Sequence, residues 1–175
     1  MSGIATKTHS LMQKTAGTKA QLLDTRKTTP LLRELEKYAV KCGGGSNHRF
    51  GLFDMVLIKD NHVDFAGGIK AAILTANDYL AKHGKKLEIE IEVRNFDELQ
   101  EALQTGNIHR IMLDNFTPEQ IRTALTLIDG KYPVEASGGI TEENIRQYAE
   151  TGVDYISVGA LTHHIKSLDI SLLAD

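Results

Sequence analysis

The chain has 175 residues, a net charge of −3 at pH 7 and a hydrophobic fraction of 41%. This length is enough for one domain with a sizeable core, and the composition is typical of a globular protein rather than a disordered one. The slightly acidic balance argues against a general affinity for nucleic acids or anionic membrane surfaces. Any basic function must therefore be local.

The cysteine content and the apolar runs bear on the compartment. A single cysteine, Cys42, cannot form an internal disulfide and is too little for a cysteine-rich zinc site. No apolar run approaches the roughly 18 residues of a membrane span, and the first seven residues lack the basic and apolar regions of a secretory signal. The sequence therefore predicts a cytoplasmic protein.

The first half of the chain alternates helix and strand patterns. Apolar residues at helical spacing predict a helix over residues 4–16, and residues 21–25, with Leu22 and Leu23 followed by Asp24, are typical of a short buried strand. A second helix is expected over residues 30–43, because Pro30 suits a first helical turn. A second buried strand over residues 55–58 has residues 59–62 as its polar end, and the next helix begins at Ile69 and ends near Gly84.

The third strand, residues 87–93, alternates apolar and acidic residues without a break. One face of this strand is a column of three carboxylates, those of Glu88, Glu90 and Glu92. At an exposed sheet edge the column is ordinary solvated charge, but three adjacent like charges are unfavourable without compensation. In a barrel the column faces inward, toward a cation or a basic ligand.

Three more strands follow in the second half. They are expected over residues 110–114, 134–139 and 155–159, with helices over residues 96–106, from Pro118 onward and over residues 141–152. Six successive strand and helix units indicate a parallel sheet in a single domain, residues 1–175.

Polar residues recur where the predicted strands end, at Asp24, Lys59, Glu92, Asp114, Ser137 and Gly159. In a TIM-like barrel this edge carries the active site. An open, doubly wound sheet also binds its ligand at this edge. The alternation in the third strand favours closure, so we expect an α/β fold, an incomplete TIM-like barrel of about six parallel strands.

Basic residues gather in three segments, each at the end of an apolar run. They are Arg26 and Lys27, then His48 and Arg49, then Lys59 and His62. In an acidic chain this concentration indicates an anion-binding pocket. The glycine triplet at residues 43–45 is compatible with a phosphate cradle or with a flexible loop.

Two glycine turns, at residues 137–140 and 157–160, follow the last two predicted strands. Such turns expose backbone amides, and the phosphate sites of barrels lie after the last strands. We therefore expect phosphate binding there.

Glu92 and Asp114 end neighbouring strands, and their oxygens could hold Mg²⁺ together with substrate phosphates and water. The alternative is an ion-pair network with Lys27 or Lys59. Lys59 could also be the Schiff-base lysine of an aldolase, if basic neighbours favour its neutral amine.

Seven segments of the chain resemble one family, quinolinate phosphoribosyltransferase. They appear in the family's order as SGIAT at 2–6, DTRKTTP at 24–30, GGGSNHR at 43–49, KDNH at 59–62, MLDN at 112–115, EASGGI at 135–140 and SVGALTH at 157–163. The resemblance implies transfer of a phosphoribosyl group from phosphoribosyl pyrophosphate to the nitrogen of quinolinate, followed by loss of CO₂. The product is nicotinate mononucleotide, and Mg²⁺ is the implied cofactor.

The resemblance also implies residue roles by position. The quinolinate carboxylates would be clamped by Arg26, His48, Arg49 and Lys59. The groups facing pyrophosphate and Mg²⁺ would be Lys27, Glu92 and Asp114, which with Lys59 form the implied catalytic set. The ribose phosphate would be held by Ser137, Gly138, Gly159 and His163.

The chain departs from the family pattern in three ways. Arg94 stands where a polar or acidic residue is expected, and His164 replaces a serine. Family members form dimers or hexamers and carry an N-terminal sandwich domain, and the resemblance implies that this chain begins where that domain meets the barrel. Two other functions stay open: a barrel that binds phosphate and dicarboxylate without turnover, and a related phosphoribosyltransferase acting on another pyridine or a molybdenum-related ligand.

Overall fold

The computed structural model describes residues 1–165 and 171–174, and a parallel sheet of six strands forms the centre of this part of the chain. The strands are β1 (Gln21–Leu23), β2 (Val56–Ile58), β3 (Ile89–Val93), β4 (Arg110–Asp114), β5 (Val134–Ser137) and β6 (Tyr155–Ser157). They lie in the order β1-β6-β5-β4-β3-β2, and each neighbouring pair is parallel. Strands β1 and β2 are thus the two edges, and the curled sheet is an incomplete barrel, as predicted.

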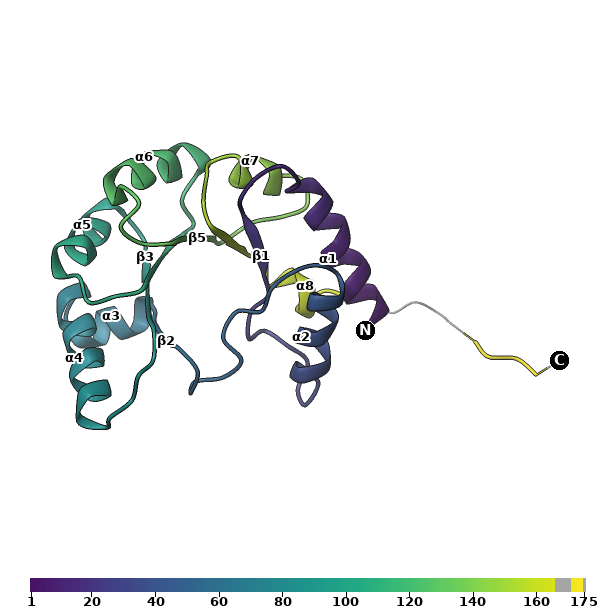
Figure 1. Ribbon diagram of the computed structural model, residues 1–175, viewed down its shortest axis with the longest axis horizontal. Coiled ribbons are helices and arrows are strands. Elements are labelled where there is room, and N and C mark those ends of the chain that lie inside the picture. Colours follow the sequence, from purple (N-terminus) through teal and green to yellow (C-terminus); the bar gives the residue numbers. More distant parts are fainter. Residues whose placement is uncertain (166–170, 175) are drawn as a thin grey trace.

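Helices surround the sheet on its outer side (Figure 1). They are α1 (Ser2–Lys14), α2 (Arg33–Cys42), α3 (Asp60–Ala66), α4 (Ile69–Lys82), α5 (Phe96–Thr105), α6 (Pro118–Ile128), α7 (Ile145–Ala149) and α8 (Ala160–His163). In Figure 1, α4 to α7 form an arc outside the strands, the arrangement that successive βα crossovers produce. None of these helices has the length and apolar character that crossing a bilayer requires.

The alternation in β3 places its two faces in different environments. Ile89, Ile91 and Val93 pack in the hydrophobic core between the sheet and the helices. Glu90 and Glu92 are almost fully buried on the other face, where they contact basic side chains inside the barrel. The inward-facing acidic column is therefore confirmed for these two carboxylates, whereas the third acidic residue precedes the strand and is exposed.

The start of the second helix differs from the prediction. Helix α2 begins at Arg33 rather than at Pro30. Leu31 has a left-handed backbone, with φ of +66°, and the Leu32 N–H donates to the Thr29 carbonyl, so a separate turn precedes the helix. Proline here belongs to that turn and not to the first helical turn.

Helix α3 was not predicted, and helix α7 is shorter than expected. The polar residues at the end of β2 begin α3, where the ring of His62 accepts a hydrogen bond from the Lys59 N–H and so caps the helix. Helix α7 begins only at Ile145. The side chain of Asn144 binds the main chain of Thr141 and Gly139, and thereby holds the preceding residues in a turn.

Residues 46–48 lie along the open side of β1. The Ser46 N–H donates to the Leu22 carbonyl at 2.8 Å, and the Asp24 N–H donates to the Ser46 carbonyl at 3.2 Å. The glycines before this segment serve packing, because a Cβ on Gly43 would collide with the main chain and side chains of α1. Close packing against α1 and α2 thus explains Gly43 and Gly45, and Gly44 has a left-handed backbone with φ of +91°. The sequence left a phosphate cradle or a flexible loop open for this triplet.

Candidate active site

A cavity of about 610 Å³ opens at the carboxyl ends of the strands. All the residues that the sequence assigned to catalysis or binding line it: Arg26, Lys27, His48, Arg49, Lys59, Glu92, Asp114, Ser137, Gly138, Gly159 and His163. Leu57 and Met112 add apolar surface. The basic residue His62 caps α3 and does not line this cavity. The structure thus brings the predicted residues together, while their individual roles stay predictions.

Arg26 and Arg49, which we call the basic wall, are two guanidinium groups on one side of this cavity. Burial and the charge of Arg26 lower the pKa of Arg49. Within the described part of the chain, the buried Nε of Arg26 has no hydrogen-bond acceptor. Two guanidinium groups that repel each other, one with an unused donor, are arranged to receive an anion, and planar carboxylates suit their geometry.

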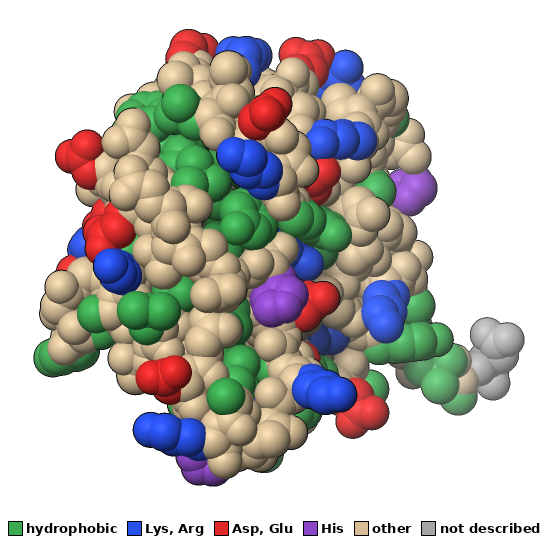
Figure 2. Space-filling view, turned by 60° about the vertical axis from the view of Figure 1, so that its left-hand side comes forward, with side chains coloured by type: hydrophobic (Ala, Val, Ile, Leu, Met, Phe, Trp, Pro, Cys, Tyr) green, Lys and Arg blue, Asp and Glu red, His purple; other side chains and the backbone are tan. Residues whose placement is uncertain are grey.

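The basic wall lies within the cavity. On the face drawn in Figure 2, acidic and basic side chains are interspersed, and no broad patch carries one sign of charge. That face therefore offers no single-sign surface that would attract an anionic ligand.

Two carboxylates stand on the wall of the cavity formed by β3 and β4. Glu92 Oε2 lies 2.7 Å from the Nζ of Lys59, so the ion-pair alternative is realised for these two residues. The two oxygens of Asp114 accept hydrogen bonds from Ser137 Oγ and Asn115 Nδ2, both at 2.7 Å. Carboxylate oxygens fixed beside an anion pocket fit a Mg²⁺ ion that takes its other ligands from phosphates and water.

The ion pair of Lys59 also bears on the aldolase alternative. A Schiff base forms from a neutral amine. Lys59 Nζ instead donates a hydrogen bond at 2.7 Å to Glu92, which is only 4% exposed. The geometry therefore favours a role for Lys59 in binding anions.

The two glycine turns form the side of the cavity next to β5 and β6. Gly138 has a φ of +89°, and a Cβ there would collide with Asn115, so the turn requires glycine. A Cβ on Gly159 would lie 2.9 Å from His163 Nε2 and 3.3 Å from Lys27 Cδ. Glycine at these positions lets polar groups approach the backbone amides that would bind a phosphate.

Lys27 and His163 meet beside the second turn. The Oγ1 of Thr162 donates to the Lys27 carbonyl at 2.6 Å, which ties the loop after β1 to α8. Burial, with the nearby charges of His164 and Lys27, lowers the pKa of His163. At neutral pH His163 is therefore a neutral hydrogen-bonding group, and Lys27 supplies the positive charge.

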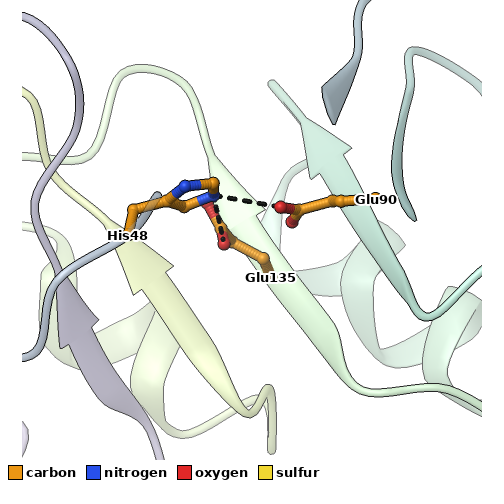
Figure 3. Close-up of side chains that lie close together, drawn as sticks. All are labelled: His48, Glu90 and Glu135. Carbon is orange, nitrogen blue, oxygen red and sulfur yellow. Dashed lines mark ion pairs between the residues drawn. The ribbon is translucent and has the colours of Figure 1, made fainter. Parts of the chain in front are cut away.

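Three buried side chains meet inside the barrel (Figure 3). His48 Nε2 lies 3.0 Å from Glu90 Oε2 and 3.4 Å from Glu135 Oε2. Burial lowers the pKa of His48, but hydrogen bonds and charges of Glu135 and Glu90 outweigh it and raise the pKa to about 9. Burial and the charge of Glu135 raise the pKa of Glu90 to about 7. Burial also acts on Glu135, yet His48 and Arg110 outweigh it and lower its pKa.

The same three residues could share a metal ion by distance alone, because one ligand atom from each lies within 4.8 Å of the others. However, His48 Nδ1 accepts a hydrogen bond from the Arg49 N–H at 2.7 Å. The raised pKa of His48 keeps a proton on Nε2 at neutral pH, and Nε2 is the atom that would bind the metal. Metal-bound histidines instead donate through their second nitrogen. The cluster is therefore better suited to sharing protons than to holding a metal.

Comparison with known proteins identifies the family. Residues 4–173 match the family model described as the C-terminal domain of quinolinate phosphoribosyl transferase. The chain belongs to this family.

Curated quinolinate phosphoribosyltransferases are similar over the whole chain. The decarboxylating quinolinate phosphoribosyltransferase 2 of Nicotiana glauca, named as mitochondrial, is 44% identical over 189 residues, which cover 100% of this chain and 53% of the relative. The probable carboxylating nicotinate-nucleotide pyrophosphorylase of Bacillus subtilis is 46% identical over 98% of this chain and 58% of its own length. The chain thus spans about half the length of these curated relatives.

Solved structures of the family share this fold. The nicotinate-nucleotide pyrophosphorylase of Francisella tularensis superposes with a TM-score of 0.89 at 47% identity, over 97% of this chain and 59% of that one. The enzyme of that name from Pyrococcus furiosus has a TM-score of 0.71 at 17% identity, over 94% of this chain and 47% of that one, and so shows the fold alone.

Sequence reasoning missed several charged groups in and beside this cavity. Arg110 Nη1 lies 3.3 Å from Glu135 Oε2, and the guanidinium stacks over Tyr155 at 4.1 Å. Glu135 alternates with apolar neighbours in β5, the same period of two that revealed the acidic column in β3, whereas Arg110 opens β4 ahead of three apolar residues. Lys37 is buried on α2, three residues from the buried Val40 and hence on the same helix face. A charged residue within an apolar stripe was the available signal.

Proposed function

We propose that this chain carries the site that transfers the phosphoribosyl group of phosphoribosyl pyrophosphate to the nitrogen of quinolinate, with decarboxylation. The products are nicotinate mononucleotide, CO₂ and pyrophosphate. One observation carries this proposal: the basic wall and the two glycine turns line a single cavity, with Lys27 beside Gly159. The family of the chain and the names of its relatives support the same reaction.

The residues of the cavity supply binding, orientation and charge. The basic wall, with His48 and Lys59, would hold the two carboxylates of quinolinate, and the glycine turns would hold the ribose phosphate with Ser137 and His163. The ring nitrogen and the anomeric carbon are then held in line for transfer. Lys27 would stabilise the departing pyrophosphate. After transfer, the positively charged ring nitrogen withdraws electrons and assists loss of CO₂.

We propose that Glu92 and Asp114 hold Mg²⁺ together with oxygens of the pyrophosphate. Both carboxylates line the cavity, and hard oxygen ligands of this kind suit the ion. The ion would neutralise negative charge on the leaving group. A direct check is a Mg²⁺ titration of pyrophosphate binding, which we expect to be stimulated in the wild type and much less in Asp114→Asn.

The test of the reaction is an assay of nicotinate mononucleotide formation that depends on quinolinate, phosphoribosyl pyrophosphate and Mg²⁺. Turnover by this chain supports the proposal directly. A second candidate is a barrel that binds both ligands without turnover. Binding of quinolinate without product would select this candidate.

We also propose that the protein assembles as a dimer or larger oligomer and is cytoplasmic. Large apolar side chains at Leu52 and Phe53 are each 70% exposed, as expected for a surface that another subunit or domain covers. The plant relative is named as mitochondrial, so location needs its own test. Sedimentation of the purified protein and fractionation of the source cell would address the two proposals.

A further inference from the structure

A buried ion pair lies behind the basic wall. Asp24, at the end of β1, and Lys37, on α2, have side chains that are 0% and 3% exposed, and Lys37 Nζ lies 2.5 Å from Asp24 Oδ1. Neither residue lines the substrate cavity. Taking two charges out of water is costly, and a buried pair often adds little to stability compared with apolar residues of similar size. The pair therefore calls for an explanation other than stability.

The pair binds both backbone polar groups of His48, the N–H and the carbonyl. The His48 N–H donates to Asp24 Oδ1 at 2.9 Å, and Lys37 Nζ donates to the His48 carbonyl at 3.0 Å. Asn47 Nδ2 donates to Asp24 Oδ2 at 2.5 Å and to the Lys37 carbonyl at 2.9 Å. Backbone hydrogen bonds therefore attach Ser46 to the β1 segment, whereas side-chain contacts hold the two residues that follow.

The next residue, Arg49, is fixed in turn by His48. Its N–H donates to His48 Nδ1 at 2.7 Å, and its Nη1 donates to the Met55 carbonyl at 3.3 Å. The ring of His48 is anchored on its other side by Glu90 and Glu135. The direction of the Arg49 guanidinium therefore depends on a segment that side chains, and not a strand ladder, hold in place.

We propose that Asp24 and Lys37 are positioning residues that hold the His48 and Arg49 backbone so that Arg49 faces the dicarboxylate ligand. The identity of that ligand rests on the proposed function, whereas the positioning itself does not. The pair touches no substrate. It acts by fixing the segment at residues 46–49, on which half of the basic wall stands.

The first experiment compares two ligands on a double variant, Asp24→Asn with Lys37→Met, which removes both buried charges together. Calorimetric titration should show quinolinate bound about ten-fold more weakly than by the wild type, because small displacements of a binding group are costly. Inorganic phosphate, which the glycine turns would bind, should bind with unchanged affinity. The matched control, Lys14→Met with Glu142→Gln, removes an exposed ion pair on another face and should leave both affinities unchanged. Unchanged quinolinate affinity in the folded double variant would overturn the proposal.

A ligand-free measurement separates this proposal from the proposed function. Amide hydrogen exchange at His48 and Arg49 should be at least about ten-fold faster in the double variant, with exchange in β4 unchanged. If the wild type does not bind quinolinate, the proposed function fails, and exchange still decides whether the pair positions the segment. If the His48 and Arg49 amides exchange at the same rates in the double variant as in the wild type, the pair does not position the segment.

Asn47→Ala serves if the double variant does not fold, because it removes a contact to Asp24 without leaving a buried charge unpaired. It should lower quinolinate affinity about three-fold and leave phosphate affinity unchanged, since one of several hydrogen bonds is lost. If Asn47→Ala binds each ligand with the same affinity as the wild type, the proposal is contradicted.

Discussion

The two sides of the cavity are built in different ways. On the side of β4 to β6, the polar groups stand at the ends of paired strands, with Asp114 opposite Ser137 in the ladder. On the side of the basic wall, residues 46–49 make one isolated bridge to β1 and are then held by buried side chains. The ladder fixes one side through its backbone, whereas the other side depends on a few charged residues. Substitutions should therefore affect the two sides unequally.

The largest expected effect is on the side that side chains hold. Lys37→Met alone leaves the carboxylate of Asp24 buried without its partner and should lower the free energy of unfolding by about 3–5 kcal/mol. Adding Asp24→Asn should recover most of this loss, because the unpaired charge is removed. Urea denaturation of both variants measures the difference. A cost below about 1 kcal/mol for the single variant would show that the pair is not effectively buried.

Removing one guanidinium group of the basic wall tests the same side without disturbing its support. Arg49→Met should weaken quinolinate binding by about 2–3 kcal/mol, because a charge-assisted contact to a carboxylate is lost. Phosphate affinity should stay the same. Titration calorimetry measures the affinity of the variant for each ligand. If quinolinate and phosphate binding weaken equally, the cavity has no separate dicarboxylate and phosphate sides.

The buried cluster inside the barrel predicts a pH dependence of stability. The pKa of His48 is raised from 6.5 to about 9, so the folded state binds more protons than the unfolded state between these values. This stabilisation is fully present below pH 6.5 and is lost as the pH rises toward 9. It amounts to at most about 1–3 kcal/mol, because the second proton goes to Nδ1, which then no longer accepts from the Arg49 N–H. His48→Gln should show a flatter profile over this window. Denaturation at pH 6, 7.5 and 9 compares the two, and parallel profiles would exclude His48 as the source.

The smallest expected effect lies on the ladder side. Gly138→Ala should cost about 1–2 kcal/mol more than Gly139→Ala. Both glycines have positive φ, but a Cβ at 138 would also collide with Asn115, whereas one at 139 meets nothing within 4 Å. Thermal unfolding of the two variants gives the difference. Equal costs would indicate that Asn115 moves aside without loss.

Much of the ladder side could be predicted from the sequence. The period of two in β3 and the glycine turns after β5 and β6 are local patterns, and a parallel barrel places all carboxyl strand ends at one edge. Pro118 and the capping pair of Thr117 and Gln120 likewise mark the start of α6 where the structure has it. Local rules sufficed because each of these features is set by neighbours in sequence.

The support of the basic wall could not be predicted in this way. Asp24 and Lys37 are 13 residues apart, and their contacts to His48 depend on where the tertiary fold places α2 relative to the end of β1. The start of α2 was also misplaced, because Pro30 is a good first helical residue while the left-handed backbone of Leu31 is set by its tertiary surroundings. The basic residues could be identified from the sequence, but the groups that position them could not.

The basic wall should make the cavity distinguish a dicarboxylate from a monocarboxylate. The most direct test is a calorimetric titration of the wild-type chain with quinolinate and, separately, with nicotinate, which lacks the second carboxylate. We predict that quinolinate binds at least about ten-fold more tightly, since an additional charge-assisted contact is worth about 1.5–3 kcal/mol. Equal affinities for the two ligands, or no binding of quinolinate, would contradict the assignment of the basic wall.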